Sequence, residues 1–132
     1  MSHQMSVDDF KKKYITPFRD LYYYYSREEG FVVWRMGTGL NVELLHIRAW
    51  EPRKGLGTRL LGHMLDRLSA DNHSLTPYHS IYGFTRIDNN RARGFYAAMG
   101  FNLQTIEGLY KEGRAVFFWQ EFAELVRLRG LA

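Results

Sequence analysis

A glycine-containing loop between an expected strand and an expected helix is the first candidate for chemistry. A strand is expected over 42–50, and an amphipathic helix over 58–68 has leucines and a methionine at helical spacing. Between them the chain reads Arg53-Lys54-Gly55-Leu56-Gly57-Thr58. N–H groups at a helix N-terminus attract anions, and glycine lets an anion approach the backbone closely. A phosphate or pyrophosphate site is the first hypothesis, and an ordinary strand-to-helix turn is the alternative.

Two well-known phosphate motifs do not fit this loop. A Walker A loop needs Lys and then Ser or Thr after its last glycine, whereas Thr58 and Arg59 follow Gly57. A dinucleotide-binding loop needs a third glycine where this sequence has Leu60. Taken alone, the loop leaves the anion site and the simple turn equally open.

A second motif lies at 89–101 and changes this balance. Its asparagine, its Ala-x-x-Phe-Tyr and its closing Gly-Phe resemble the second signature of the GCN5-related N-acetyltransferases, the GNAT superfamily. The matching residues are Asn89, Ala92, Phe95, Tyr96, Gly100 and Phe101. The family's first signature, Gln/Arg-x-x-Gly-x-Gly/Ala, falls on the loop, where Gly55 and Gly57 match and Pro52 replaces the Gln or Arg. The resemblance extends over about residues 31–120.

The resemblance implies acetyl-CoA as the co-substrate and assigns it a binding site. The pyrophosphate would lie on the loop residues Arg53, Lys54, Gly55, Leu56, Gly57 and Thr58. The pantetheine arm would run beside the strand backbone at Ile47, Arg48 and Ala49, much as an added strand would. Asn89 would hydrogen-bond the pantetheine, or would simply cap its helix.

The resemblance also implies an acid and a base. Tyr96 occupies the family's general-acid position; a phenol, with an ordinary pKa of about 10, suits a thiolate leaving group whose thiol pKa is about 8.5. Packing beside Phe95 is the alternative role for Tyr96. Glu43 matches the family's strand glutamate, which acts as a base through water, and it is otherwise a solvent-facing carboxylate. Glu51 and His46 remain alternative bases.

No metal site is expected. His73 and His79 have no companion ligands at the spacing of a metal site, and His63 with Asp66 on one helix face offers only two ligands.

The expected elements form a mixed sheet. Strands over 21–25, 31–36 and 40–50 have short connections and predict an antiparallel meander. The helix at 58–68 then crosses over to a strand at 78–87, which must run parallel to the strand at 42–50. A helix that Gly100 ends, a hairpin over 102–111 and 114–122, and a last helix over 121–129 with Phe122, Leu125 and Val126 inward complete the pattern. A short helix over 7–14, capped by Ser6, begins it.

Length and composition place these elements in one domain. The 132 residues predict a single GNAT-like acyltransferase domain, 1–132, of the α+β class. Its mixed sheet combines an antiparallel meander with a central parallel strand pair. Helices flank this sheet, and the N-terminal part is shorter than the family's. The absence of cysteine fits a reducing cytoplasm. No apolar run is long enough to span a membrane, so no membrane partner is expected.

The net charge of +4 suits a polyanionic partner such as CoA, and it suits nucleic acid as well. Lys11-Lys12-Lys13 is typical of a solvated helix face, so nucleic acid is not the expected partner.

The sequence therefore predicts an N-acetyltransferase that moves an acetyl group from acetyl-CoA directly to an amine acceptor, whose identity the sequence leaves open. Two alternatives remain: an inactive GNAT-like interaction module, which Pro52 and the short N-terminal part motivate, and a nucleic-acid-binding protein. Apolar side chains in the last segment leave a homodimer open.

Overall fold

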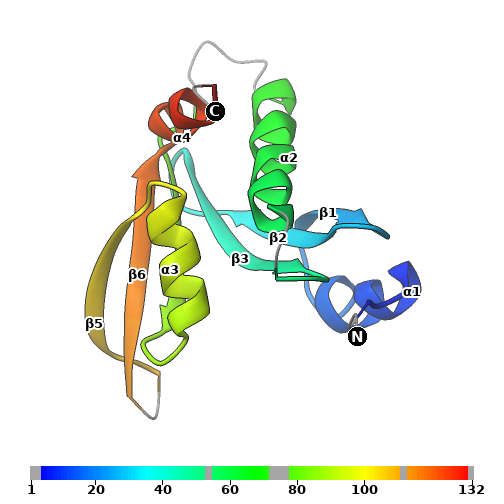
Figure 1. Ribbon diagram of the computed structural model, residues 1–132, viewed down its shortest axis with the longest axis horizontal. Coiled ribbons are helices and arrows are strands. Elements are labelled where there is room, and N and C mark those ends of the chain that lie inside the picture. Colours follow the sequence, from blue (N-terminus) through cyan, green and yellow to red (C-terminus); the bar gives the residue numbers. More distant parts are fainter. Residues whose placement is uncertain (1–3, 53–54, 72–77, 111–112, 131–132) are drawn as a thin grey trace. The chain divides into compact units, whose positions relative to one another are not determined.

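A computed structural model describes residues 4–52, 55–71, 78–110 and 113–130 of the chain (Figure 1). Six strands form one sheet in the order β1-β2-β3-β4-β6-β5. The strands are β1 (Tyr22–Ser26), β2 (Gly30–Met36), β3 (Asn41–Ala49), β4 (Ser80–Arg86), β5 (Asn102–Tyr110) and β6 (Gly113–Glu121). The helices are α1 (Val7–Phe10), η1 (Lys11–Ile15), α2 (Leu56–Asp71), α3 (Asn90–Ala98) and α4 (Phe122–Gly130). The predicted α+β class is confirmed.

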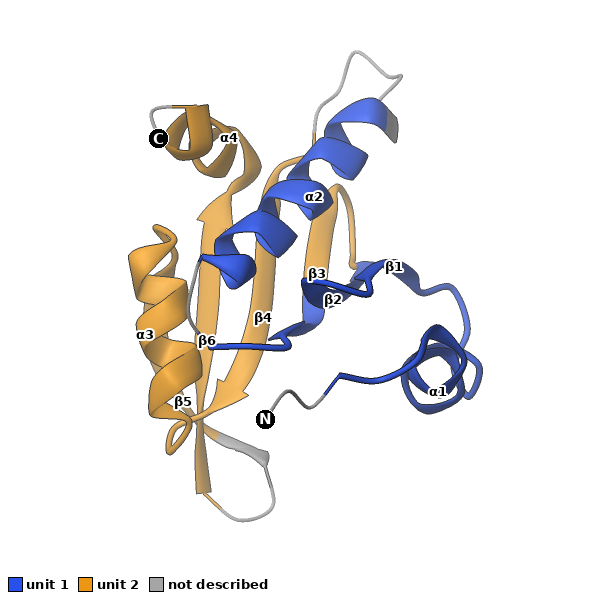
Figure 2. Cartoon of the chain, turned by 45° about the vertical axis from the view of Figure 1, so that its right-hand side comes forward, with its two compact units in different colours: residues 1–36, 44–77 blue, residues 37–43, 78–132 orange. Residues whose placement is uncertain are grey.

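The chain divides into two compact units, which Figure 2 colours separately. Unit 1 comprises residues 1–36 and 44–77, and unit 2 comprises residues 37–43 and 78–132. Strand β3 contributes its first residues to unit 2 and its remaining residues to unit 1.

The N-terminal helix of unit 1 begins where the sequence predicts. The Ser6 hydroxyl accepts a hydrogen bond from the Asp9 amide at 3.1 Å, which caps α1. The second half, η1, is a π-helix, which the sequence did not predict. Phe10 is fully buried, and its ring lies 4.7 Å from that of Phe31.

The tyrosine strand of unit 1 divides its side chains between the two faces of the sheet. Strand β1 pairs antiparallel with β2, with Tyr24 opposite Val32. The rings of Tyr23 and Tyr25 pack on Phe10, at 5.3 and 5.4 Å between centroids. Tyr24 points the other way and stacks on His63 of α2 at 4.1 Å. The run therefore contributes to packing on both faces, as its alternation requires.

Helix α2 buries the apolar stripe that the spacing predicts. Its buried side chains include Leu60, Leu61, Met64, Leu65 and Leu68. The helix begins two residues earlier than predicted, at Leu56, and continues to Asp71. Residues 69–71, which follow the predicted end of this helix at 68, are therefore helical, and 72–77 lie outside the described residues. No described helix of the protein is long and apolar enough to cross a membrane.

Unit 2 contains the predicted parallel pair. Strand β3 pairs parallel with β4 at Asn41↔Ser80, Val42↔Ile81 and Glu43↔Tyr82. Strand β6 pairs antiparallel with both β4 and β5, so the predicted final hairpin is present. Its turn at 111–112 lies outside the described residues.

One face of this sheet is packed against α3 and α4. The ring of Tyr96 in α3 stacks on Phe118 of β6 at 3.7 Å. Helix α4 buries Phe122 and Leu125 as predicted, but Val126 is 41% exposed, so its predicted inward position is wrong. The buried stripe follows every third residue from Phe122, and Val126 falls one position beyond it.

Candidate active site

The described part of the loop over 53–58, which we call the anion loop, has the geometry of a glycine-dependent helix start. Gly55 has a φ of +68°, a left-handed conformation that glycine adopts without strain. An added Cβ at Gly55 would meet nothing within 4 Å, so the backbone angle and not lack of space requires glycine here. The Arg59 amide donates to the Gly55 carbonyl at 3.1 Å, the first hydrogen bond of α2.

Leu56, Gly57 and Thr58 supply the first amides of α2, which have no acceptor within a helix. A helix of 16 residues adds its dipole at this end. Arg53 and Lys54 lie outside the described residues.

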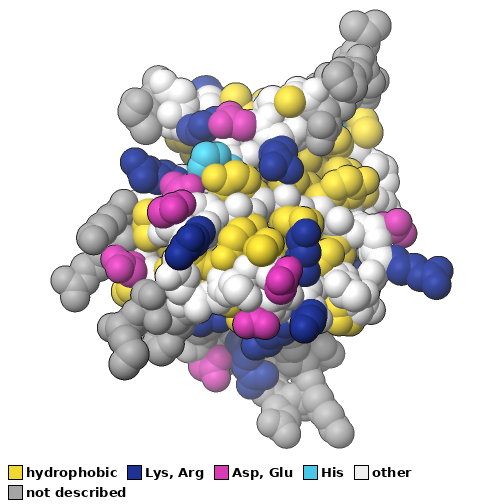
Figure 3. All heavy atoms as spheres, turned by 90° about the vertical axis from the view of Figure 1, so that its right-hand side faces the viewer, with side chains coloured by type: hydrophobic (Ala, Val, Ile, Leu, Met, Phe, Trp, Pro, Cys, Tyr) yellow, Lys and Arg dark blue, Asp and Glu magenta, His cyan; other side chains and the backbone are white. Residues whose placement is uncertain are grey.

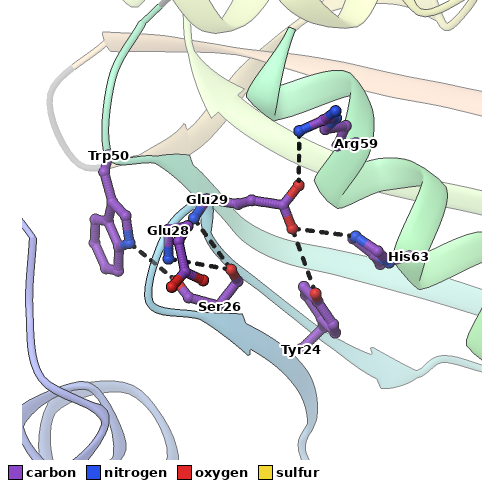
Figure 4. Close-up of polar contacts among 7 residues, drawn as sticks. All are labelled: Tyr24, Ser26, Glu28, Glu29, Trp50, Arg59 and His63. Atoms are coloured by element: carbon purple, nitrogen blue, oxygen red, sulfur yellow. Dashed lines mark hydrogen bonds and ion pairs between the residues drawn. The ribbon is translucent and has the colours of Figure 1, made fainter. Parts of the chain in front are cut away.

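Glu29, in the turn between β1 and β2, contacts α2 through its side chain (Figure 4). The Glu29 side chain is 13% exposed, and its carboxylate lies 3.2 Å from His63 Nε2 and 3.7 Å from Arg59 Nη1. The Tyr24 hydroxyl donates to the same carboxylate at 3.4 Å. Through these contacts the β1–β2 turn is tied to the first two turns of α2.

The same turn is also tied to the end of β3. The Trp50 amide donates to the Glu29 carbonyl at 3.0 Å, and Trp50 Nε1 donates to the Ser26 carbonyl at 3.0 Å. The β1–β2 turn thus holds both ends of the loop that joins β3 to α2 (Figure 4). We call this group of residues the loop brace: Tyr24, Ser26, Glu29, Trp50, Arg59 and His63. Its only sequence signal was the position of His63 one helical turn after Arg59.

The proposed pantetheine strand is half-buried at Ile47, Arg48 and Ala49. On its β2 side, Gly30 approaches so closely that an added Cβ would lie 1.9 Å from the Arg48 carbonyl oxygen. The parallel register of β3 with β4 covers Asn41–Glu43, and the strand continues for six residues to Ala49.

Asn89 caps α3. Its side-chain oxygen accepts a hydrogen bond from the Ala92 amide at 3.1 Å, and the residue is exposed. The capping role that the sequence analysis held open is therefore present. Because the cap uses the oxygen, the side-chain NH2 is the group with which Asn89 would bind a ligand.

Tyr96 is buried, with 6% of its surface exposed. Besides stacking on Phe118, its ring meets Phe95 and Phe101 edge-on at 5.4 and 5.6 Å. Burial raises the pKa of the Tyr96 hydroxyl well above its ordinary value of 10. The phenol therefore keeps its proton and is suited to donating a hydrogen bond, while complete proton transfer from it becomes harder.

Glu43 lies in a row of polar and aromatic residues across unit 2. The strand registers place Glu43 opposite Tyr82, Tyr82 opposite Trp119, and Trp119 opposite Asn102. Directly opposed residues point to the same face of a sheet. Trp119 is 38% exposed, and the Tyr82 ring meets the Phe117 ring at 6.2 Å. Tyr82 and Trp119 were not among the residues expected from the sequence, because strand register is not visible in one sequence.

The other two base candidates belong to unit 1. His46 packs edge-on against Tyr14, with ring centroids 5.0 Å apart, and partial burial lowers its pKa. Glu51 is exposed, just after β3. Glu43 belongs to unit 2.

The histidines that the structure describes do not gather with carboxylates into a ligand set. Among the described residues, no three His, Cys, Asp or Glu side chains lie close enough together to hold a metal ion. His63 instead contacts Glu29 in the loop brace. His73 lies outside the described residues.

Comparison with known proteins gives matches in structure only. No protein-family model and no curated protein matches the sequence. The ribosomal-protein-S18-alanine N-acetyltransferase of Escherichia coli is a similar solved structure, with a TM-score of 0.60 and 19% identity over 89% of this chain and 77% of that one.

Two further similar structures contain CoA or an analogue. PaiA N-acetyltransferase of Thermoplasma acidophilum, in complex with coenzyme A, has a TM-score of 0.60 and 16% identity over 77% of this chain and 61% of that one. Arabidopsis thaliana Naa50, in complex with the bisubstrate analogue CoA-Ac-MVNAL, has a TM-score of 0.56 and 21% identity over 87% and 81%. At these identities the likeness shows a shared fold.

Proposed function

We propose that this chain, which has the fold of the GNAT acetyltransferases, transfers an acetyl group from acetyl-CoA directly to an amine. The observation that carries the proposal is the start of α2, where Gly55 has a positive φ and the loop brace holds both ends of the loop. A helix N-terminus of this kind suits the pyrophosphate of CoA. The solved structures with CoA-type ligands support the same class of co-substrate.

The donor side of the site would consist mainly of backbone. We assign the pyrophosphate to the amides of Leu56, Gly57 and Thr58, with Arg53 and Lys54 adding charge. The backbone of β3 at Ile47, Arg48 and Ala49 would hold the pantetheine arm as an added strand. Asn89 would contribute its side-chain NH2. Pro52 then matters little, because these contacts do not use a side chain at that position.

The chemistry requires a base and a hydrogen-bond donor. Acetyl-CoA, when bound, supplies the acetyl group as an activated thioester. Glu43 would take the proton from the acceptor amine, directly or through a water molecule. Tyr96, kept neutral by burial, would donate its hydrogen bond where negative charge develops on the leaving sulfur.

The acceptor is an amine of unassigned identity. We place its binding site on the polar and aromatic row of unit 2 that includes Glu43, Tyr82 and Trp119. We further propose a cytoplasmic location, in keeping with the cysteine-free composition. A homodimer remains open.

Calorimetric titration with acetyl-CoA and with CoA, at two salt concentrations, tests the donor site. Stoichiometric binding at micromolar affinity is expected, followed by acetyl transfer to an amine in an acceptor screen. Binding of neither ligand would reject the donor site and favour an inactive interaction module. Steeply salt-dependent binding to RNA or DNA, with no CoA binding, would favour a nucleic-acid-binding protein.

A further inference from the structure

A groove follows the outer strand of unit 1. Strand β1 is the first strand in the sheet order, so one of its edges has no neighbouring strand among the described residues. A groove of about 440 Å³ is lined by Val7, Leu21, Tyr22, Tyr23, Tyr24, Tyr25, Trp34 and Arg67. Successive side chains of a strand point to opposite faces, so a groove lined by five consecutive residues must run along the strand's edge.

The backbone of β1 presents hydrogen-bonding groups to this groove. Arg67 Nη1 donates to the Tyr23 carbonyl oxygen at 3.4 Å, so this carbonyl points away from β2. In an antiparallel pair, backbone groups alternate between the partner strand and the opposite side. The N–H and C=O groups of Tyr23 and Tyr25 therefore face the edge, where an additional strand would pair with them.

Strand β1 itself carries none of the residue types that usually protect an edge against such pairing, and its Tyr23 carbonyl is covered by the Arg67 side chain of α2. Sheet edges are commonly guarded by lysine, proline, inward-pointing charges or bulges. Strand β1 reads Tyr-Tyr-Tyr-Tyr-Ser and contains none of these residue types, and its register with β2 is regular over five pairs. The Tyr22 side chain is 47% exposed at one end of the groove. Hydrophobic side chains gather in the middle of the face shown in Figure 3, with charged side chains among and around them.

The charge of the lining indicates what kind of strand fits. Among the described residues that line the groove, Arg67 is the only charged one. Its guanidinium also lies 5.8 Å from the centre of the Tyr24 ring, and Lys11 Nζ lies 6.0 Å from that of Tyr23. The acidic residues Asp8, Asp20 and Asp66 neighbour the groove in sequence but do not line it. The lining thus favours an incoming acidic side chain.

We propose that this edge binds an extended, acidic segment of a partner protein, which adds to the sheet as a strand beside β1. The backbone of the segment pairs with Tyr23 and Tyr25. A carboxylate of the segment takes the guanidinium of Arg67, which releases the Tyr23 carbonyl for the backbone hydrogen bond. Alternate side chains of the segment pack against the rings on the two sides of the edge. A second copy of this chain fits less well, because its own Arg67 and Lys11 would meet those of the first.

The test uses capped heptapeptides of alternating Val and Thr with either Glu or Lys at the centre, titrated into the full chain by NMR or calorimetry. The Glu peptide is expected to bind about fivefold more tightly than the Lys peptide, since a partly exposed ion pair contributes about 1 kcal/mol. Arg67→Glu should reverse this preference. Arg127→Glu, a matched charge reversal on α4 in unit 2, should leave it unchanged.

Backbone pairing is tested separately with N-methylated peptides, which need no protein variant. Methylation of the amides that face β1 should abolish binding, while methylation of the alternate amides should leave it intact. The proposal would be overturned if neither set of methylated amides weakened binding, or if neither parent peptide bound. A dimer in sedimentation that Tyr23→Pro converts to monomer would assign the edge to a second copy and would also overturn it. Binding of CoA plays no part in these outcomes, so they test this proposal independently of the proposed enzyme activity.

Discussion

Removal of the Glu29 carboxylate should loosen the anion loop without disrupting the fold. Glu29 accepts from Tyr24 and contacts His63 and Arg59, so Glu29→Ala removes the side-chain half of the loop brace. The Trp50 amide bond to the Glu29 carbonyl remains, because it uses the backbone. The variant therefore separates the tie to α2 from the tie to β3.

The expected cost follows from the burial of the partners. A hydrogen bond to a charged group contributes about 1.5–3 kcal/mol when its partners are buried. His63 and Arg59 are 38% and 68% exposed and regain water when the carboxylate is lost. We therefore expect Glu29→Ala to lower the free energy of unfolding by about 1–2 kcal/mol, with little of it from Arg59. Glu29→Gln keeps one acceptor and should cost about half as much.

CoA affinity is the decisive measurement. If the brace positions the first amides of α2, Glu29→Ala should weaken CoA binding by up to about tenfold, since 1.4 kcal/mol corresponds to tenfold. Urea unfolding gives the stability and calorimetric titration gives the affinity. Glu28→Ala is the matched control: its backbone amide bonds to Ser26 and would be kept. If Glu29→Ala matched Glu28→Ala in both measurements, the brace would have no role in the loop.

Four further outcomes follow from the site. Tyr96→Phe should lower turnover roughly 10²-fold in an acetyl-transfer assay while leaving CoA affinity in calorimetry nearly intact; unchanged turnover would leave Tyr96 with packing alone. Gly55→Ala should lower the free energy of unfolding by about 1 kcal/mol in urea titration, because of its positive φ; an unchanged midpoint would contradict the strain. Gly57→Val should block CoA in titration with the circular dichroism spectrum preserved, and normal affinity would refute the pyrophosphate placement. His46 has a lowered pKa in the folded chain, so the unfolded chain binds more protons as the pH is lowered through about 6.5, and the free energy of unfolding should decrease as the pH is lowered there. His46→Gln should make this pH dependence weaker in urea unfolding at pH 7.5 and 5.5. An unchanged pH dependence in the variant would assign the effect to other groups.

The fold was predictable because its signals are local. The apolar spacing of α2, the cap at Ser6 and the alternation of the strands each lie within a few residues. The connection through α2 then dictated the parallel pair of β3 and β4. By contrast, the π-helix η1 has no sequence pattern of its own.

The site was predictable only in part, because its remaining contacts are long-range. Glu29 lies 30 residues from Arg59 and 34 from His63, so no spacing rule joins them. Tyr82 lies opposite Glu43, and Trp119 lies opposite Tyr82, through strand register, which one sequence does not display. Asn89 was the easier case, since a cap acts on the amide three residues later.

The division of β3 between the two units affects how the chain is made. Residues 41–43 pair with β4 in unit 2, whereas 44–49 belong to unit 1. Neither unit is therefore one continuous segment, and no single cut of the chain releases either of them whole. During synthesis, unit 1 has its last segment only when residue 77 has emerged, and the start of β3 must then wait for β4. Until β4 has been made, residues 41–43 lack this partner strand, which leaves them open to misassociation at this stage of translation.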